Sequence, residues 1–197
     1  MAHADAATTL RELETVRQKA RGSLNASWLA FLIWGTIVLA SAPFTQIGDG
    51  AAVGVYWMLA TPLGLLITWR AYRSYELRIG LVDRNERLYA AIIATMVVAA
   101  FVLGAAGQGG MLSAVGPLIA IGVGLVALGV VKARDLLVAF AGDAMIVLGI
   151  VIAVADPDDP ALLAALGQGA ITILAGLIAL ERQRSSQRRS GPEPAKS

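Results

Sequence analysis

Six long apolar stretches, separated by short segments that hold most of the charges, constrain this chain more than any other feature. At a rise of ~1.5 Å per residue, a helix needs roughly 20 residues to cross a hydrocarbon core of ~30 Å. Helices of soluble domains rarely stay apolar on every face over such a length. The sequence therefore predicts an all-α integral membrane bundle of six transmembrane helices, packed as three antiparallel hairpins. The predicted spans are residues 26–44, 51–69, 88–104, 111–131, 135–155 and 161–180.

The composition supports a membrane protein and argues against an enzyme. Hydrophobic residues make up 57% of the 197 residues, charged residues only 15%, and the mean hydropathy is +0.68. Cysteine is absent and the single histidine, His3, lies in the polar leader, which excludes thiolate chemistry and cysteine-based zinc sites. There is no Walker-type phosphate loop, no nucleophile beside a candidate base and no pair of carboxylates within a span. We therefore expect no catalytic residue, no cofactor, no metal and no nucleic acid.

The positive charges predict the orientation in the membrane. All 16 Lys and Arg residues lie in the leader, between spans two and three, between spans four and five, or in the tail. These four segments share one side of a six-span protein, and positively charged segments remain in the cytoplasm. The sequence thus predicts a multi-pass protein of the bacterial inner membrane with both termini inside. Its outer turns are short, so a small-molecule site would lie mostly within the bundle.

The cytoplasmic segments predict contacts with lipid or protein. In the leader, residues 1–25, Thr9 and Glu12 suggest a capping box that opens a short amphipathic helix. This helix either lies against anionic head groups or presents a solvated face. Residues 70–87 are predicted to form the longest loop, and residues 182–197 a basic, disordered tail. Anionic lipid is expected at four arginines of the tail, Arg182, Arg184, Arg188 and Arg189.

Spans four and five should be close neighbours. Only Lys132 to Arg134 separate them, so they must run antiparallel and side by side. In span four, Gly116, Ala120 and Gly124 recur every fourth residue. Such a face of small residues lets helices approach closely.

Aspartates mark the starts of spans five and six. Asp135 is placed to cap span five. The DPDDP segment places Asp156, Asp158 and Asp159 together, which raises the alternative of a calcium site. These residues lack the ligand number and loop length of an EF-hand, whereas an aspartate directly before Pro160 is an ordinary helix start. A helix cap is therefore the preferred interpretation.

Asp143 is the only ionisable residue in the interior of a span. It follows Asp135 by eight residues, which places it about 12 Å from the cytoplasmic boundary, near the middle of the membrane. Thr61, Thr95 and Thr172 fall about 10 to 14 Å from the same boundary. No intramembrane cation is available, so the carboxyl group should favour its neutral form, which donates a hydrogen bond.

Two interpretations of Asp143 remain open. It either joins helices as a neutral carboxylic acid or binds a proton or a cationic substrate in a water-filled cavity. The second interpretation predicts a small transporter or permease component with Asp143, Thr61, Thr95 and Thr172 as the binding residues. The alternative function is a non-transporting membrane anchor or regulatory partner, whose basic segments dock a cytoplasmic protein. Either protein could form a homo-oligomer.

The first two spans carry a resemblance to a known family. Residues 34–44, WGTIVLASAPF, and residues 56–73, YWMLATPLGLLITWRAYR, resemble a family of small uncharacterised polytopic bacterial membrane proteins of actinobacterial type. The resemblance covers about residues 28–75, and the family motif corresponds to Tyr56-Trp57 with Pro62 and Gly64. It implies a bacterial membrane protein often encoded near a winged-helix regulator. The resemblance carries over no activity, cofactor or catalytic residue to this chain.

Overall fold

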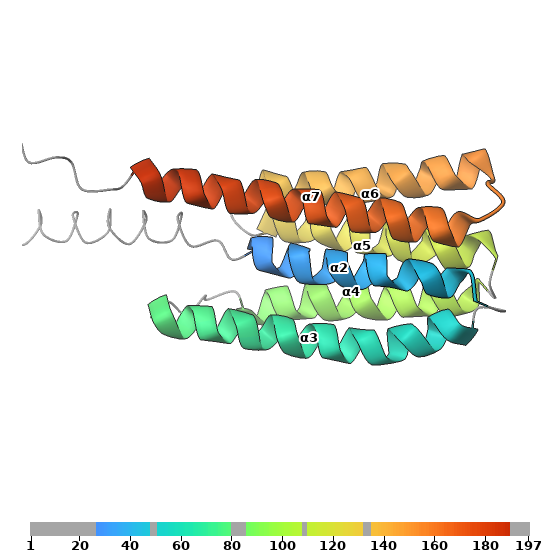
Figure 1. The fold of residues 1–197 in the computed structure, drawn as a ribbon, viewed down its shortest axis with the longest axis horizontal. Coiled ribbons are helices and arrows are strands. Elements are labelled where there is room, and N and C mark those ends of the chain that lie inside the picture. The colour runs from blue at the N-terminus through green and yellow to red at the C-terminus, as the bar shows by residue number, and fades with distance from the viewer. Residues whose placement is uncertain (1–26, 48–50, 80–85, 108–109, 132–134, 190–197) are drawn as a thin grey trace, which may run out of the picture.

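The computed structural model describes residues 27–47, 51–79, 86–107, 110–131 and 135–189. These residues form six helices that run alongside one another in alternating directions (Figure 1). Each helix contains a segment long and apolar enough to cross a membrane. The protein is therefore an all-α, multi-pass membrane protein, as its apolar stretches predict. The helices are α2 (Ser27–Thr45), α3 (Ala51–Ile79), α4 (Glu86–Ala106), α5 (Met111–Val131), α6 (Leu136–Ala155) and α7 (Pro160–Arg189).

Two helices are longer than their apolar stretches. α3 has 29 residues and α7 has 30, which corresponds to about 43 to 45 Å of helix. The predicted loop from residue 70 and the predicted disordered tail from residue 182 are therefore wrong for residues 70–79 and 182–189. Hydropathy falls where the membrane would end, but Arg, Glu, Gln and Leu are good helix formers, and the next glycines come only at Gly80 and Gly191. The short helix predicted within residues 1–25 lies outside the described residues.

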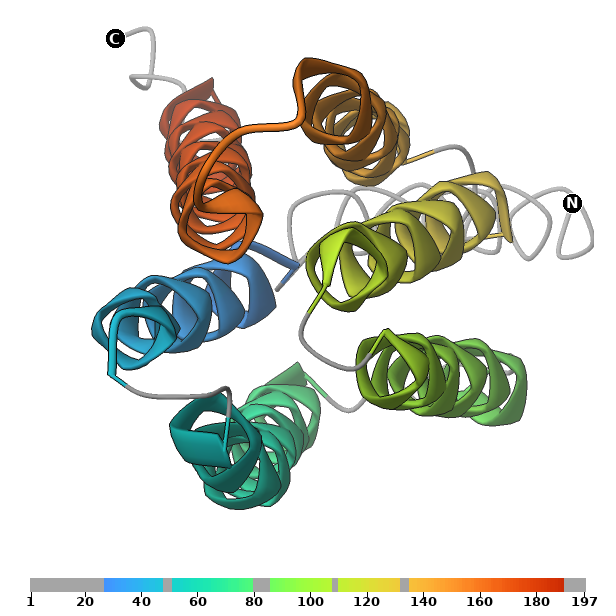
Figure 2. The ribbon, with the colours of Figure 1, turned by 90° about the vertical axis from the view of Figure 1, so that its right-hand side faces the viewer.

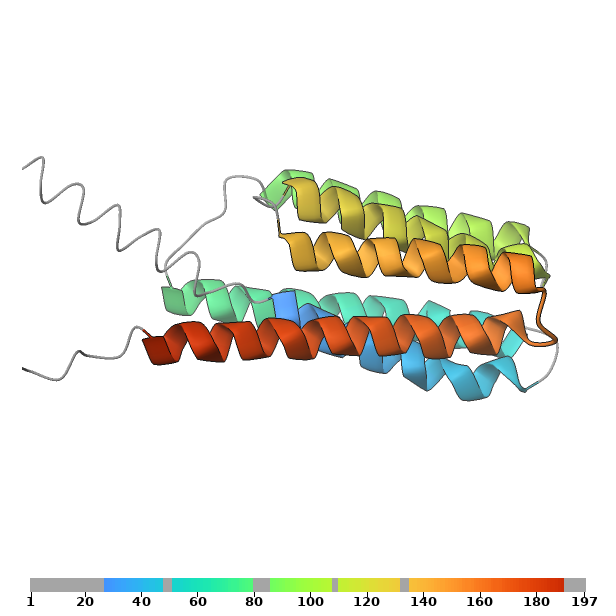
Figure 3. The same ribbon diagram turned by 90° about the horizontal axis from the view of Figure 1, so that it is seen from above.

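The six helices form two layers of three. Figures 2 and 3 show α3, α2 and α7 in one layer and α4, α5 and α6 in the other. The three predicted hairpins are present, but the most extensive packing joins helices of different hairpins, α2 with α7 and α5 with α6. Among the described helices, the backbone of α3 comes close only to α2 and that of α4 only to α5. The two layers meet where α7 packs on α5 and α6, and Phe31 of α2 belongs to a buried cluster with Val138 and Ala141 of α6.

Glycines form the closest contacts between helices. A Cβ atom at Gly142 of α6 would lie 2.5 Å from the carbonyl oxygen of Gly122 in α5, so the two backbones touch. A Cβ atom at Gly169 of α7 would lie 2.5 Å from the Leu39 side chain of α2. The small-residue face predicted in span four also packs closely, with Gly116 and Gly124 against Leu103 and Met96 of α4. Small residues thus permit the close approach on which membrane helix packing depends.

Candidate functional site

Asp143 lies on the outer face of the bundle. α6 buries one face against its neighbours, formed by Val138, Ala141, Gly142, Met145, Gly149 and Ile152. Asp143 is exposed on the opposite face. Its flanking residues there are large and apolar, with Phe140 65% and Val147 58% exposed. Asp143 makes no hydrogen bond or ion pair with any other described residue. The carboxyl group therefore points away from the bundle interior, towards lipid or towards another protein.

The three threonines do not surround Asp143. Thr61 is buried on α3, and its hydroxyl oxygen has no hydrogen-bond partner among the described residues. Thr95 is exposed on α4 and donates a hydrogen bond to the Ala91 carbonyl oxygen (2.9 Å). Thr172 is buried on α7 and donates to the Gln168 carbonyl oxygen (2.6 Å). None of the three threonine hydroxyls is therefore hydrogen-bonded to Asp143.

The helix packing keeps these residues apart. Neither α3 nor α4 contacts α6 in the described chain, so Thr61 and Thr95 are separated from Asp143. α7 does contact α6, but Thr172 faces the other way, because its Cβ lies 3.3 Å from the position of a Cβ at Gly35 of α2. A common depth in the membrane does not bring the four side chains together.

The sequence of α6 itself indicates that the Asp143 side chain points away from the neighbouring helices. Gly142 and Gly149 are seven residues apart and therefore share one face of α6. Both are buried in the packed interface. A helical wheel places Asp143 about 100° from Gly142, on the side of Phe140 and Val147. Small residues on one face and bulky residues on the other indicate which side packs against a neighbouring helix.

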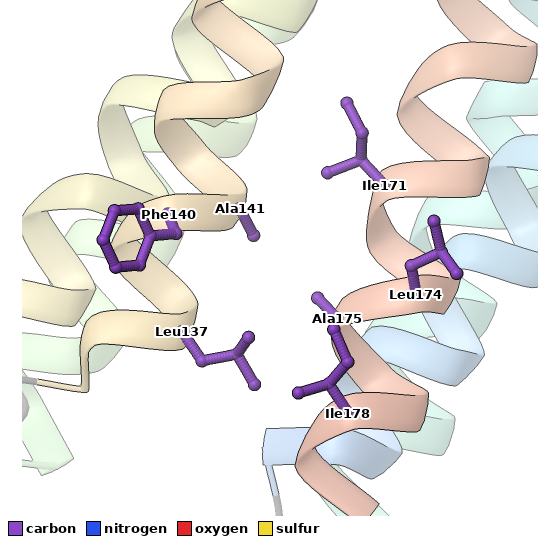
Figure 4. Close-up of a pocket in the computed structure, with 7 residues that line it drawn as sticks. All are labelled: Leu137, Phe140, Ala141, Ile171, Leu174, Ala175 and Ile178. Carbon is purple, nitrogen blue, oxygen red and sulfur yellow. The ribbon is translucent and has the colours of Figure 1, made fainter.

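A groove at the contact between α6 and α7 is apolar, and Asp143 is not among its lining residues. It has a volume of about 210 Å³ and lies between α6 and α7. Figure 4 shows side chains from the two helices facing each other across it. The lining residues are Leu137, Phe140, Ala141, Ile171, Leu174, Ala175 and Ile178. None of them can bind a proton or an ion, so the groove is not a polar substrate site.

The extended ends of α3 and α7 present a basic surface. Both helices project beyond their neighbours at the same end of the bundle (Figures 1 and 3). The Arg73 guanidinium lies 5.4 Å from the centre of the Trp69 ring, a distance typical of a cation–π contact. We call the exposed arginines of the two ends the basic extension: Arg70, Arg73, Arg182, Arg184 and Arg188.

Asp159 caps α7, as its position before Pro160 predicts. The backbone N–H of Leu162 donates to Asp159 Oδ1 (2.9 Å), and the Gln46 amide donates to Asp159 Oδ2. The cap therefore also ties the end of α2 to the start of α7. Asp135 occupies the N-cap position of α6, but its side chain makes no capping hydrogen bond. In the described part of the chain, no group of three or more acidic or His side chains is arranged to hold a metal ion.

Replacing Asp159 with alanine is expected to lower the free energy of unfolding by about 1 kcal/mol, the usual effect of losing an N-cap. Asp159→Asn should retain most of the stability, because an amide oxygen can still accept from Leu162 N–H. Denaturation in detergent micelles measures both. An equal loss in the two variants would show that the charge, and not the cap, stabilises this end.

The motif that carries the family resemblance packs α3 on α2. The Tyr56 hydroxyl donates to the Ile37 carbonyl oxygen (2.5 Å), and the Tyr56 ring stacks on Phe44 with centroids 4.8 Å apart. A Cβ atom at Gly64 would lie 3.2 Å from the Trp34 ring. These residues therefore have a structural role in the first hairpin.

Comparison with protein-family models, with curated proteins and with solved structures finds no significant match. Membership of the bacterial family suggested by residues 28–75 thus stays a prediction. The described residues themselves show an all-α membrane protein, in which six helices are long and apolar enough to cross a membrane.

Proposed function

We propose that the protein is a membrane anchor that holds a cytoplasmic protein with an acidic surface. The basic extension is the observation that carries this proposal. Two long helices leave the bundle at the same end and expose arginines on helical turns. Arginine on an ordered helix binds carboxylates with little further loss of conformational freedom. The positive-inside rule assigns this end to the cytoplasm.

A transporter with Asp143 as its proton-binding or cation-binding residue has less support. Such a site needs polar groups around the carboxyl group and water reaching it. Asp143 instead lies on the outer face, and it does not line the groove between α6 and α7, which is itself apolar. If Asp143 does serve transport, Asp143→Asn should change the pH dependence of flux in proteoliposomes once a substrate is found. Unchanged flux across pH would count against a transport role.

The docking proposal is tested at Ser185, which is exposed among the arginines of α7. The chain has no native cysteine, so Ser185→Cys accepts a thiol-linked photo-crosslinker at one position only. In native membranes with cytosol we expect a protein adduct that weakens as salt rises, because exposed charges are screened. Reversing Arg182, Arg184 and Arg188 to glutamate should reduce the adduct at least about tenfold, through several lost ion pairs.

The control carries the same crosslinker on Asp158→Cys, an exposed residue that lies just before the start of α7, at the opposite end of this helix. It should give no adduct with the same protein. Adducts formed only with phospholipid would indicate that the basic extension binds anionic head groups, as predicted for Arg182, Arg184, Arg188 and Arg189. That result, or an adduct that survives charge reversal, would contradict the docking proposal.

A further inference from the structure

The outer face of α6 has the spacing of a helix–helix contact, although no described helix covers it. Its residues recur at intervals of four and three along the helix, and the five apolar ones are 52% to 80% exposed. Figure 2 shows α6 at the end of its layer, where its backbone comes close only to α5 and α7 among the described helices. We call this set the α6 seam: Leu136, Phe140, Asp143, Val147, Ile150 and Val154.

Asp143 distinguishes the α6 seam from an ordinary lipid-facing surface. An exposed leucine or valine side chain is favourable in contact with lipid. A carboxyl group exposed to acyl chains, in contrast, finds no hydrogen-bond partner there. Whether neutral or charged, an unpaired polar group is unfavourable in hydrocarbon. No other residue in the described part of the chain forms a hydrogen bond or an ion pair with it. A partner within the membrane would remove this cost.

We propose that two copies of the chain associate in parallel through the α6 seam, with each Asp143 hydrogen-bonded to its counterpart. All copies insert with the same orientation, because the positive charges of each lie on one side. A two-fold axis along the membrane normal then places equal residues at equal depth. A neutral carboxylic acid both donates and accepts, so Asp143 is complementary to itself.

The sequence and the spacing favour a second copy over a different partner. Intervals of four and three are those of helix pairs that cross in a left-handed way. No span interior of the chain contains Lys, Arg or His, so self-association pairs an acid with an acid. A single polar residue within such a seam commonly sets its register. A different partner would need its own polar or cationic residue at the same depth.

Cysteine crosslinking tests the seam. Val147 of α6 and Val98 of α4 are both exposed valines, at 58% and 61%. In a chain without native cysteine, Val147→Cys should form a disulfide between copies upon oxidation, and the matched Val98→Cys should not. Equal crosslinking of both would indicate random collision and would overturn the proposal.

Substitution of Asp143 tests the hydrogen bond. Asp143→Leu should raise the dissociation constant of the dimer about 3- to 30-fold, measured by energy transfer between labelled copies in bilayers. Asp143→Asn should stay close to the wild type, because an amide also donates and accepts. A purified wild-type chain that remains monomeric, or a Val147→Cys variant that crosslinks only to another protein in native membranes, would overturn self-association. Neither outcome affects docking at the basic extension.

Discussion

Replacing Gly142 with leucine is expected to lower the free energy of unfolding by about 3 kcal/mol, at the upper end of overpacking effects. The backbones of α5 and α6 touch at this point, since even a Cβ atom would lie 2.5 Å from the Gly122 carbonyl oxygen. A leucine side chain must force the two helices apart. Because α5 and α6 pack more extensively than most pairs, the loss extends along both helices. Unfolding in mixed micelles measures it.

The matched control is Ala153→Leu, at an exposed position of the same helix. It adds a comparable side chain on the outside and should change stability by less than about 0.5 kcal/mol. Gly142→Ala should fall between the two variants. If Gly142→Leu were as stable as the control, α5 and α6 could not be in backbone contact.

Cysteine labelling is expected to give an all-or-none result for the orientation. In spheroplasts, a membrane-impermeant maleimide should label Asp158→Cys fully and Ser185→Cys only after lysis. The reason is that all 16 basic residues occupy segments on one side of the six spans, and moving them across the membrane is unfavourable. The native chain, without cysteine, provides the unlabelled control.

The reverse labelling pattern would place the basic extension outside the cell. A cytoplasmic docking role would then be excluded, whereas self-association through α6 would be unaffected. Labelling of both positions before lysis would indicate mixed orientations, which contradicts the prediction from the charges. The experiment therefore tests the orientation separately from the helix packing.

The extended helices α3 and α7 show that hydropathy does not predict where a helix ends. Apolar length predicted α5 at residues 111–131, and the helix is Met111–Val131. The same criterion ended spans two and six at residues 69 and 180, but α3 and α7 continue to Ile79 and Arg189. Backbone hydrogen bonds continue into the aqueous side as long as helix-forming residues follow. Hydropathy reports where the membrane ends and not where the helix ends.

The candidate site around Asp143 was likewise only partly predictable from the sequence. Eight residues from Asp135 to Asp143 define a depth, and depth alone placed the threonines level with the carboxyl group. Whether side chains meet depends on which helices are neighbours and how each helix is rotated. Gly142 and Gly149 indicate from the sequence which face of α6 packs against a neighbouring helix. The sequence does not indicate which helices are neighbours, because contacts such as that of α2 with α7 join segments far apart in the chain.

The sequence by itself determined the number of apolar helices, their positions and the helix start at Asp159, because each depends on residues within one or two turns. The tertiary structure alone decided that α2 packs on α7, that α3 and α4 do not contact α6 in the described chain, and that Asp143 faces outward. Those features depend on how closely glycine-lined faces from distant segments fit together. Such a fit depends on the three-dimensional shapes of the two helix surfaces, and the hydropathy of a local segment does not predict it.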